Sequence, residues 1–370
     1  MKSIRILVVD DSVVIRKLLT DTLSDDSAIE VVGTASDGRI ALSKLAQLKP
    51  DLITLDIEMP VMNGLETLAA IRKLHPKLPV IMFSTLTEHG AAATLDALSL
   101  GASDYATKPS DSGSYPVAVE RVRAELIPKI KALCGIATVN TPAPLVPRPA
   151  LKVRPHTNAR LEIVAIGTST GGPNALAEVL PSIPADFPVP IVVVQHMPPI
   201  FTRMLAERLS SRSAFPVEEG ITGAILSSGH AWIAPGNFHM KVTRAGMRQR
   251  LDVNEDEPEN SCRPSVDVLF RSVAKAYGSS ALAVVMTGMG ADGALGARDI
   301  REAGGNVIIQ DEGSSVVWGM PGLVHAWGLD DGCYPLNQLG AEITRRVLHS
   351  RGPQSHFNAK KNSGLEQTAQ

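Results

Sequence analysis

The feature that most constrains the fold is an alternation of short apolar runs with helix-period segments, which occurs twice along the chain. In the first half, strands are expected at residues 4–9, 29–34, 52–55, 80–83 and 105–106. Helix-period segments separate or follow them at residues 13–23, 40–48, 65–74, 91–100 and 117–133. Strands that alternate with helices predict a parallel sheet covered by helices on both faces. We therefore expect an α/β class domain with a doubly wound, five-stranded parallel sheet.

A proline-rich stretch separates this half from a second one. The sequence TPAPLVPRPALKVRP at residues 141–155 contains five prolines, which predicts an extended, semi-rigid linker. In the second half, strands are expected at residues 163–166, 191–195, 281–286 and 307–310, and helices near 175–180, 201–209, 266–276 and 295–303. Short alternating runs punctuated by glycine at residues 217–253 predict an inserted β-hairpin.

These patterns give a domain plan for the whole chain. We expect one domain at residues 1–134, a linker at 135–158, a doubly wound, mostly parallel α/β domain at 159–350 and a disordered tail at 351–370. The formal net charge of −2 disfavours nucleic acid as the main partner, because a phosphate backbone requires a basic surface. The three cysteines show no C-x-x-C spacing, so neither a disulfide framework nor a zinc site is indicated. No apolar run approaches the ~18 residues of a membrane span and no signal-peptide core precedes the first acids, so we expect a cytoplasmic protein without direct membrane insertion.

Charged and hydroxyl side chains follow several strands of the first half. Asp10 and Asp11 follow the first strand and Asp56 ends the third, whereas Ser84 and Lys108 follow the fourth and fifth. The carboxyl ends of parallel strands meet at one edge of a sheet, where ligands bind. Converging carboxylates repel each other unless a hard cation such as Mg²⁺ neutralises them. The set favours an aspartate that accepts a phosphoryl group, with the cations offsetting charge on the transferring oxygens.

The glycine-rich sequence GTSTGG at residues 167–172 follows the first strand of the second half and has two interpretations. It matches G-x-S-x-G, in which a serine on a strand-to-helix turn is a nucleophile. Such a turn also binds phosphate through backbone N–H groups. For the first interpretation, His196 and Asp292 follow other strands and supply a base and an orienting acid for Ser169. The chain order Ser, His, Asp differs from that of α/β-hydrolases, although triads recur in several orders on unrelated folds.

A dinucleotide-binding site is the rival interpretation. GMGADG at residues 288–293 fits G-x-G-x-x-G after a strand, and Asp311 follows the next strand at about the fingerprint's spacing. Two observations count against this interpretation. The unit lies late in its domain, and a nucleotide there leaves GTSTGG and His196 unexplained.

The first half resembles the receiver domain of bacterial two-component response regulators. The resemblance rests on LVVDDS, DLITLDIEMPVMNG, PVIMFST and GASDYATKP. It implies that Asp56 is the phosphoacceptor, that Mg²⁺ takes part and that a chemotaxis histidine kinase is the phosphodonor. The Mg²⁺ ligands that it implies are Asp10, Asp11, Asp56 and the backbone carbonyl of Glu58, and the switch positions are Ser84, Tyr105 and Lys108.

The second half resembles the catalytic domain of chemotaxis-specific protein-glutamate methylesterases. The resemblance rests on AIGTSTGG, VVQHMPPIFT, HAWIAPGNFHM, RPSVDVLF, VVMTGMGADG and QDEGSSVVWGMP. It implies that Ser169 is the nucleophile, His196 the general base and acid, and Asp292 the residue that orients the imidazole. The implied substrates are γ-glutamyl methyl esters, and also glutamines, on the cytoplasmic helices of methyl-accepting chemoreceptors, with no cofactor for the esterase reaction.

An oxyanion formed at this site requires backbone N–H donors. We expect one donor at Met289 in the GMG turn and a supporting hydrogen bond from Thr170. The resemblance further implies that the receiver covers the Ser169 site until Asp56 is phosphorylated. Two other functions stay open at this point: a response regulator whose output domain binds a dinucleotide, and a regulator that docks to receptors without catalysis.

Overall fold

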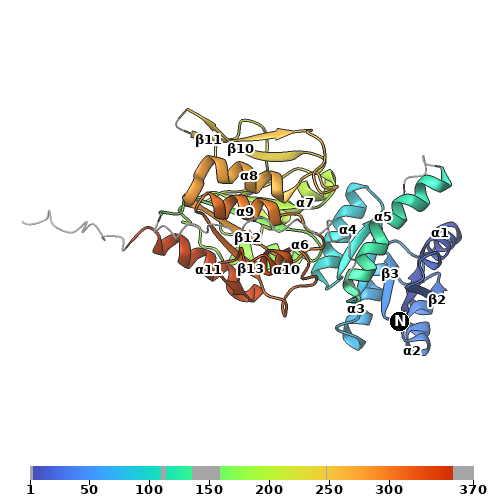
Figure 1. Cartoon of the computed structure of the whole chain (residues 1–370). Helices are drawn as coiled ribbons and strands as arrows, with labels where there is room; N and C mark the ends of the chain where they lie inside the picture. The colour runs from blue at the N-terminus through green and yellow to red at the C-terminus, as the bar shows by residue number, and fades with distance from the viewer. Residues whose placement is uncertain (1–2, 110–113, 136–158, 247, 353–370) are drawn as a thin grey trace, which may run out of the picture.

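Two α/β units form the part of the chain that the computed structural model describes, which is residues 3–109, 114–135, 159–246 and 248–352. The units pack side by side, and the first is blue to teal in Figure 1. The predicted linker at 135–158 and tail at 351–370 lie almost entirely outside the described residues, so the domain limits at 134 and 159 remain predictions.

The first unit is the five-stranded parallel sheet that the sequence predicts, with strand order β2-β1-β3-β4-β5. Its strands are β1 (Ile4–Val9), β2 (Ile29–Ala35), β3 (Leu52–Asp56), β4 (Val80–Ser84) and β5 (Asp104–Thr107). Its helices are α1 (Val13–Ser24), α2 (Gly38–Leu48), α3 (Gly64–Leu74), α4 (Glu88–Ser99) and α5 (Tyr115–Leu133). Four of these helices begin at a side chain that accepts a hydrogen bond from a first-turn amide, namely Ser12, Asp37, Asn63 and Thr87. Polar residues that directly follow a strand or loop therefore set where the helices start.

The second unit is built on a seven-stranded sheet with order β14-β13-β12-β6-β7-β9-β8, and each pair in it is parallel. Its strands are β6 (Ile163–Thr168), β7 (Ile191–Gln195), β8 (Val217–Glu219), β9 (Ala231–Ile233), β12 (Ala281–Val285), β13 (Asn306–Gln310) and β14 (Cys333–Tyr334). Its helices are α6 (Gly172–Val179), α7 (Pro199–Ser210), α8 (Val266–Tyr277), α9 (Ala294–Glu302), α10 (Met320–Ala326) and α11 (Leu336–His349), with short 3-10 turns at Leu180–Ser182 and Gly278–Ser280.

Side chains of the central strand β6 alternate between the two faces of this sheet. Ile163 and Ala165 pack in the cluster that contains α8, α9 and α10. Val164 and Ile166 pack in the cluster that contains α6, α7 and α11, which also takes in buried residues of the first unit. The sheet is therefore covered on both faces, and one apolar core runs across the junction of the two units.

The inserted hairpin is confirmed, but it is shorter than expected. The strands β10 (His239–Ala245) and β11 (Arg248–Asn254) pair antiparallel and form a separate two-stranded sheet. Within the same stretch, β8 and β9 are not hairpin strands, because they pair in parallel and extend the main sheet beyond β7. A three-residue strand shows the same alternation of side chains whether it pairs in parallel or antiparallel. The sequence pattern alone therefore assigned β8 and β9 to the hairpin, which is wrong. None of the described helices is long and apolar enough to cross a membrane.

Candidate functional site

The acidic residues of the first unit meet at the carboxyl edge of its sheet, as the sequence predicts. Lys108 Nζ lies 2.8 Å from both Asp10 Oδ2 and Asp56 Oδ1. Asp10 and Asp56 are buried, whereas Asp11 beside them is exposed. One lysine therefore faces two buried carboxylates, which leaves an excess of negative charge at this edge.

This charge excess fits a divalent cation. Burial raises the pKa of Asp56 to about 6, and the neighbouring charge of Asp10 adds to the rise although Lys108 opposes it. Asp56 Oδ2 is buried and has no hydrogen-bond partner among the described residues. Ligand atoms of Asp10, Asp11 and Asp56 lie within 4.8 Å of one another. Carboxylate oxygens are the donors that Mg²⁺ prefers, so these residues fit the predicted ion.

Besides Lys108, the two other predicted switch residues, Ser84 and Tyr105, lie in different surroundings. Ser84 Oγ is buried and donates a hydrogen bond to the backbone carbonyl of Gly90, at 3.1 Å. Tyr105 is buried at the junction of the units, where its ring stacks on Phe201 of α7 with a centroid distance of 4.8 Å and an interplanar angle of 10°. Glu58, whose carbonyl is a predicted metal ligand, has its side chain 3.4 Å from His89 Nε2.

Ser169 occupies the turn between β6 and α6 at the carboxyl edge of the second sheet. Its backbone amide donates to Thr287 O at 3.0 Å, and Gln195 Nε2 donates to its carbonyl at 3.0 Å. A Cβ on Gly288 would lie 2.8 Å from the Ser169 Cβ, so only glycine fits beside the serine. Gly171, with φ of +79°, gives the backbone the left-handed conformation that starts α6. Neighbouring strand ends therefore fix the position of Ser169.

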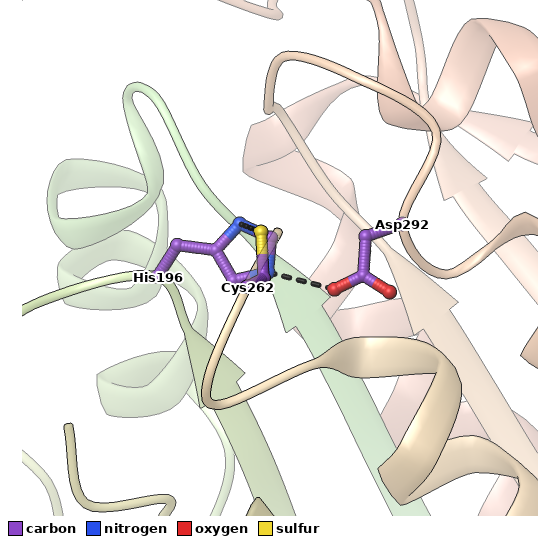
Figure 2. A group of neighbouring side chains, drawn as sticks. All are labelled: His196, Cys262 and Asp292. Carbon is purple, nitrogen blue, oxygen red and sulfur yellow. Dashed lines mark hydrogen bonds and ion pairs between the residues drawn. The ribbon is translucent and has the colours of Figure 1, made fainter. Parts of the chain in front are cut away.

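His196 and Asp292 come together as predicted. His196 Nε2 lies 2.8 Å from Asp292 Oδ2 (Figure 2). Asp292 is held at the N-terminus of α8, where the backbone amides of Val266 and Asp267 donate to its carboxylate at 2.7 and 2.9 Å. Ser265 Oγ, at the N-cap of α8, donates to the same carboxylate at 2.8 Å. Burial alone would raise the pKa of Asp292, but its bond to His196 and these amides lower it to about 2. Asp292 is therefore a fixed negative charge.

That charge changes the proton affinity of His196. Burial opposes protonation of the imidazole, yet the hydrogen bond and charge of Asp292, with Cys262, raise its pKa to about 10. Cys262 Sγ lies 3.8 Å from His196 Nδ1, the ring nitrogen that does not face Asp292 (Figure 2). Because Nε2 faces Asp292, Nδ1 is the ring nitrogen left to accept a proton. Among the described residues, no hydrogen bond joins Ser169 Oγ to His196, although both side chains line one pocket.

This pocket lies at the junction of the two units. The second unit contributes Ser169 and His196 to its lining, and the first unit contributes Leu86 and Tyr105. Thr170, the residue after the serine, donates a hydrogen bond from Oγ1 to Asp104 Oδ2 of β5, at 3.0 Å. The first unit therefore lines the same pocket as the serine and engages the hydroxyl of its neighbour.

The two predicted oxyanion residues differ in what they contact. The Thr170 hydroxyl is occupied by Asp104. The backbone amide of Met289 meets no acceptor among the described residues, and it directly follows the glycine that packs on Ser169. Its role as an oxyanion donor stays a prediction.

The dinucleotide interpretation finds no support in the glycine-rich loop. Asp311, the predicted ribose ligand, accepts hydrogen bonds from the amide and hydroxyl of Ser314, at 3.1 and 2.5 Å. The carbonyl of Gly288 accepts from the amides of Gly319 and Met320, and the loop's aspartate is the partner of His196. Within the fingerprint, Gly288 therefore packs on the serine and Asp292 binds the histidine, whereas Asp311 is bonded to Ser314.

Three residues near the site were not predicted as site residues. Asn260 Nδ2 donates to Asp292 Oδ1 at 3.0 Å and to Asp267 Oδ2 at 2.8 Å, while Cys262 contacts His196 and Ser265 binds Asp292. Ser265 had a signal, since a serine directly before a helix-period run predicts an N-cap. Asn260 and Cys262 lie in a loop in which Asn260 and Ser261 have positive φ, and no periodicity predicts where such a loop runs.

Comparison with known proteins points to one family for each unit. The model of the response regulator receiver domain matches residues 6–120, and the model of the CheB methylesterase matches residues 164–343. A protein-glutamate methylesterase/protein-glutamine glutaminase of Trichodesmium erythraeum (strain IMS101) is 54% identical over 351 residues, which cover 94% of this chain and 100% of that protein. The protein of the same name in Nocardioides sp. (strain ATCC BAA-499 / JS614) is 52% identical and covers 95% of this chain, with 97% of its own length matched. The crystal structure of the Thermotoga maritima CheB methylesterase catalytic domain is 40% identical, with a TM-score of 0.49, and covers 50% of this chain and 98% of that one.

Proposed function

Because the chain belongs to the protein-glutamate methylesterase/protein-glutamine glutaminase family, we propose that it is a phosphorylation-activated serine hydrolase of bacterial chemotaxis. Its substrates are glutamate methyl esters and glutamines on the cytoplasmic helices of methyl-accepting chemoreceptors, so it acts in the cytoplasm. A chemotaxis histidine kinase supplies the phosphoryl group. The observation that carries the proposal is the pairing of His196 with the buried Asp292, because His196 lines the same pocket as Ser169 at the junction with the receiver.

In this proposal Ser169 is the nucleophile and His196 is its general base. Ser169 Oγ attacks the ester carbonyl carbon while its proton passes to His196 Nδ1, because Asp292 holds Nε2. The tetrahedral oxyanion accepts a hydrogen bond from the Met289 amide. The imidazolium then returns the proton to the methoxy oxygen, so that methanol leaves and an acyl-enzyme remains. Water attacks the acyl carbon with the same base, which releases the glutamate carboxylate and regenerates the serine.

For a glutamine side chain the same sequence of steps releases ammonia in place of methanol. The leaving group is then the amide nitrogen, which takes its proton from the imidazolium. No metal or cofactor enters either reaction in this proposal. Asp292 orients the ring and stabilises its charged form throughout.

The receiver controls this site through Asp56. Asp10, Asp11, Asp56 and the backbone carbonyl of Glu58 would hold Mg²⁺, which would offset charge on the transferring phosphoryl oxygens. Lys108, which already contacts Asp10 and Asp56, binds a phosphoryl oxygen after transfer. Ser84 exchanges its bond to Gly90 for one to the phosphate, and the movement reaches Tyr105 at the junction.

The serine mechanism is tested by methanol release from a methylated chemoreceptor. Ser169→Ala in the full chain is expected to lower kcat by a factor on the order of 10³–10⁶. Thermal unfolding of the variant should match that of the unchanged protein. A folded Ser169→Ala variant that releases methanol at the original rate contradicts the proposed nucleophile.

A further inference from the structure

The receiver places three carboxylates against the catalytic unit, two against α7 and one against the residue that follows Ser169. Glu88 at the start of α4 is paired with Arg203 of α7, and Asp96 further along α4 lies 2.7 Å from Arg208 Nη1. The third is Asp104, which accepts the hydrogen bond from Thr170. Figure 1 shows α4 lying against α6 and α7. Each acid comes from the receiver and has a partner in the unit that carries the serine, although Asp104 Oδ2 also lies 3.5 Å from Lys129 Nζ of the receiver itself.

The two arginines lie along a helix that starts at the catalytic histidine. The helix α7 begins only three residues after His196. From Arg203 to Arg208 the helix rises about 7.5 Å, and from Glu88 to Asp96 α4 rises about 12 Å. The two ion pairs therefore join α4 to α7 at two points along both helices. Tyr105 also stacks on the α7 residue Phe201.

A substrate helix of the proposed reaction gains charge of the same sign as that of Glu88 and Asp96 on α4. Each turnover on it leaves a glutamate carboxylate, so a helix with several such sites gains negative charge as the reaction proceeds. We propose that α4 and Asp104 mimic the acidic substrate helix and its product carboxylate, and that Arg203 and Arg208 bind acidic side chains of the receptor helix once the receiver moves away. This inference rests on the proposed function and names the surface that holds its substrate.

This mimicry differs from simple cover of the site, because it gives the arginines two functions. In the unphosphorylated chain they bind the receiver, and in the phosphorylated chain they bind the receptor. Opposite charges across an interface mainly select the partner and steer it into place. Removing the arginines should therefore weaken both complexes, whereas removing the acids of α4 should weaken only the first.

The test compares two double variants of the full chain on a methylated chemoreceptor fragment. Glu88→Gln with Asp96→Asn is the matched control, and Arg203→Gln with Arg208→Gln is the test. At saturating substrate without phosphodonor, both double variants should raise the rate by about threefold, because two exposed ion pairs are lost. With phosphodonor, the arginine variant should raise KM about five- to tenfold at unchanged kcat, whereas the acid variant should keep the original KM.

Salt gives an independent readout in the phosphorylated state. The KM of the unchanged protein should rise with ionic strength, and that of the arginine variant should rise much less. Arginine variants that alter only the unphosphorylated rate, as the acid variants do, overturn the inference and leave the arginines as interdomain contacts. If the unchanged protein releases no methanol from the fragment, the proposed function fails instead.

Discussion

At the scale of single residues, the proposed mechanism makes the rate depend on the proton affinity of His196. A general base must be neutral to take the proton of Ser169. Asp292 raises the pKa of His196 to about 10 in the covered site, so the imidazole is charged at neutral pH and becomes neutral as the pH rises. The rate should therefore increase with pH through the alkaline range.

Asp292→Asn tests this cause. Loss of the negative charge lowers the pKa of His196, so the rising limb of kcat/KM should move to lower pH. The maximal rate should fall by a factor on the order of 10²–10⁴, less than for His196→Gln, because the acid orients the ring without itself transferring the proton. The measurement is a pH profile of the basal methanol release of the unphosphorylated chain, in which the receiver is in place as in the structure that has this pKa. If kcat/KM rises near pH 6.5 and Asp292→Asn leaves that rise at the same pH, a group other than the His196–Asp292 pair sets the pH dependence.

Asp56 yields a prediction of stability. In the fold its pKa is raised to about 6, above the ordinary value of 3.8. Folding therefore favours the protonated carboxyl, and this stabilisation is lost as the pH rises from 3.8 to about 6. At pH 7 without Mg²⁺, Asp56→Asn should raise the free energy of unfolding by on the order of 1–3 kcal/mol. Mg²⁺ should stabilise the unchanged protein more than the variant, since the ion neutralises the same charge. Thermal unfolding with and without Mg²⁺ measures both effects, and equal stabilisation of both proteins by Mg²⁺ contradicts the assigned ion site.

The sequence predicted the residues at strand ends and missed those in irregular loops. Ser169, His196 and Asp292 each follow a buried strand, and a parallel sheet brings its strand ends to one edge. The contact of Cys262 with His196 depends on a loop with left-handed residues, whose path no pattern encodes. The bond from Thr170 to Asp104 depends on how two units pack, which short-range periodicity does not describe.

At the scale of elements, the N-terminus of α8 stabilises the charge of Asp292. Ser265 caps the helix by accepting from the Val268 amide, and its hydroxyl donates to Asp292. Ser265→Ala should lower the free energy of unfolding by about 1 kcal/mol and reduce kcat by about tenfold, because a buried carboxylate loses a donor.

Asp37→Ala is the matched control for this change. Asp37 caps α2 in the receiver by accepting from the Ile40 amide at 3.0 Å. The control should lose a similar amount of stability and keep the phosphorylated esterase rate. Chemical denaturation and methanol release on both variants separate the two effects. Equal kcat values for the two variants would mean that Ser265 acts only as a cap.

The sequence pattern predicted the positions of some strands better than those of others. A buried strand such as β12 is a continuous apolar run, so its position was predicted closely. The short strands β8 and β9 were assigned to a hairpin, because three residues show alternation but not the pairing partner. The strand β9 pairs with β7, whose Ile191 pairs with Ala231 across a long sequence separation, and β8 pairs with β9.

At the scale of the whole molecule, the receiver and the catalytic unit share one buried apolar cluster and the pocket of Ser169. Phosphorylation must therefore shift an equilibrium between covered and open arrangements. If the covered form makes up about 99% of the chain, moving to a mostly open population needs a few kcal/mol. In the proposed switch the change at Asp56 acts on Ser84 and Tyr105, and the structure stacks Tyr105 directly on Phe201 of α7.

Control of the esterase by Asp56 is tested most directly by methanol release from a methylated chemoreceptor, with and without a small phosphodonor and Mg²⁺. The full chain should release methanol at least about tenfold faster with the phosphodonor. The Asp56→Asn variant should keep the slow rate under both conditions. A phosphodonor that leaves the unchanged protein's rate unaltered, or that speeds Asp56→Asn equally, would contradict the account.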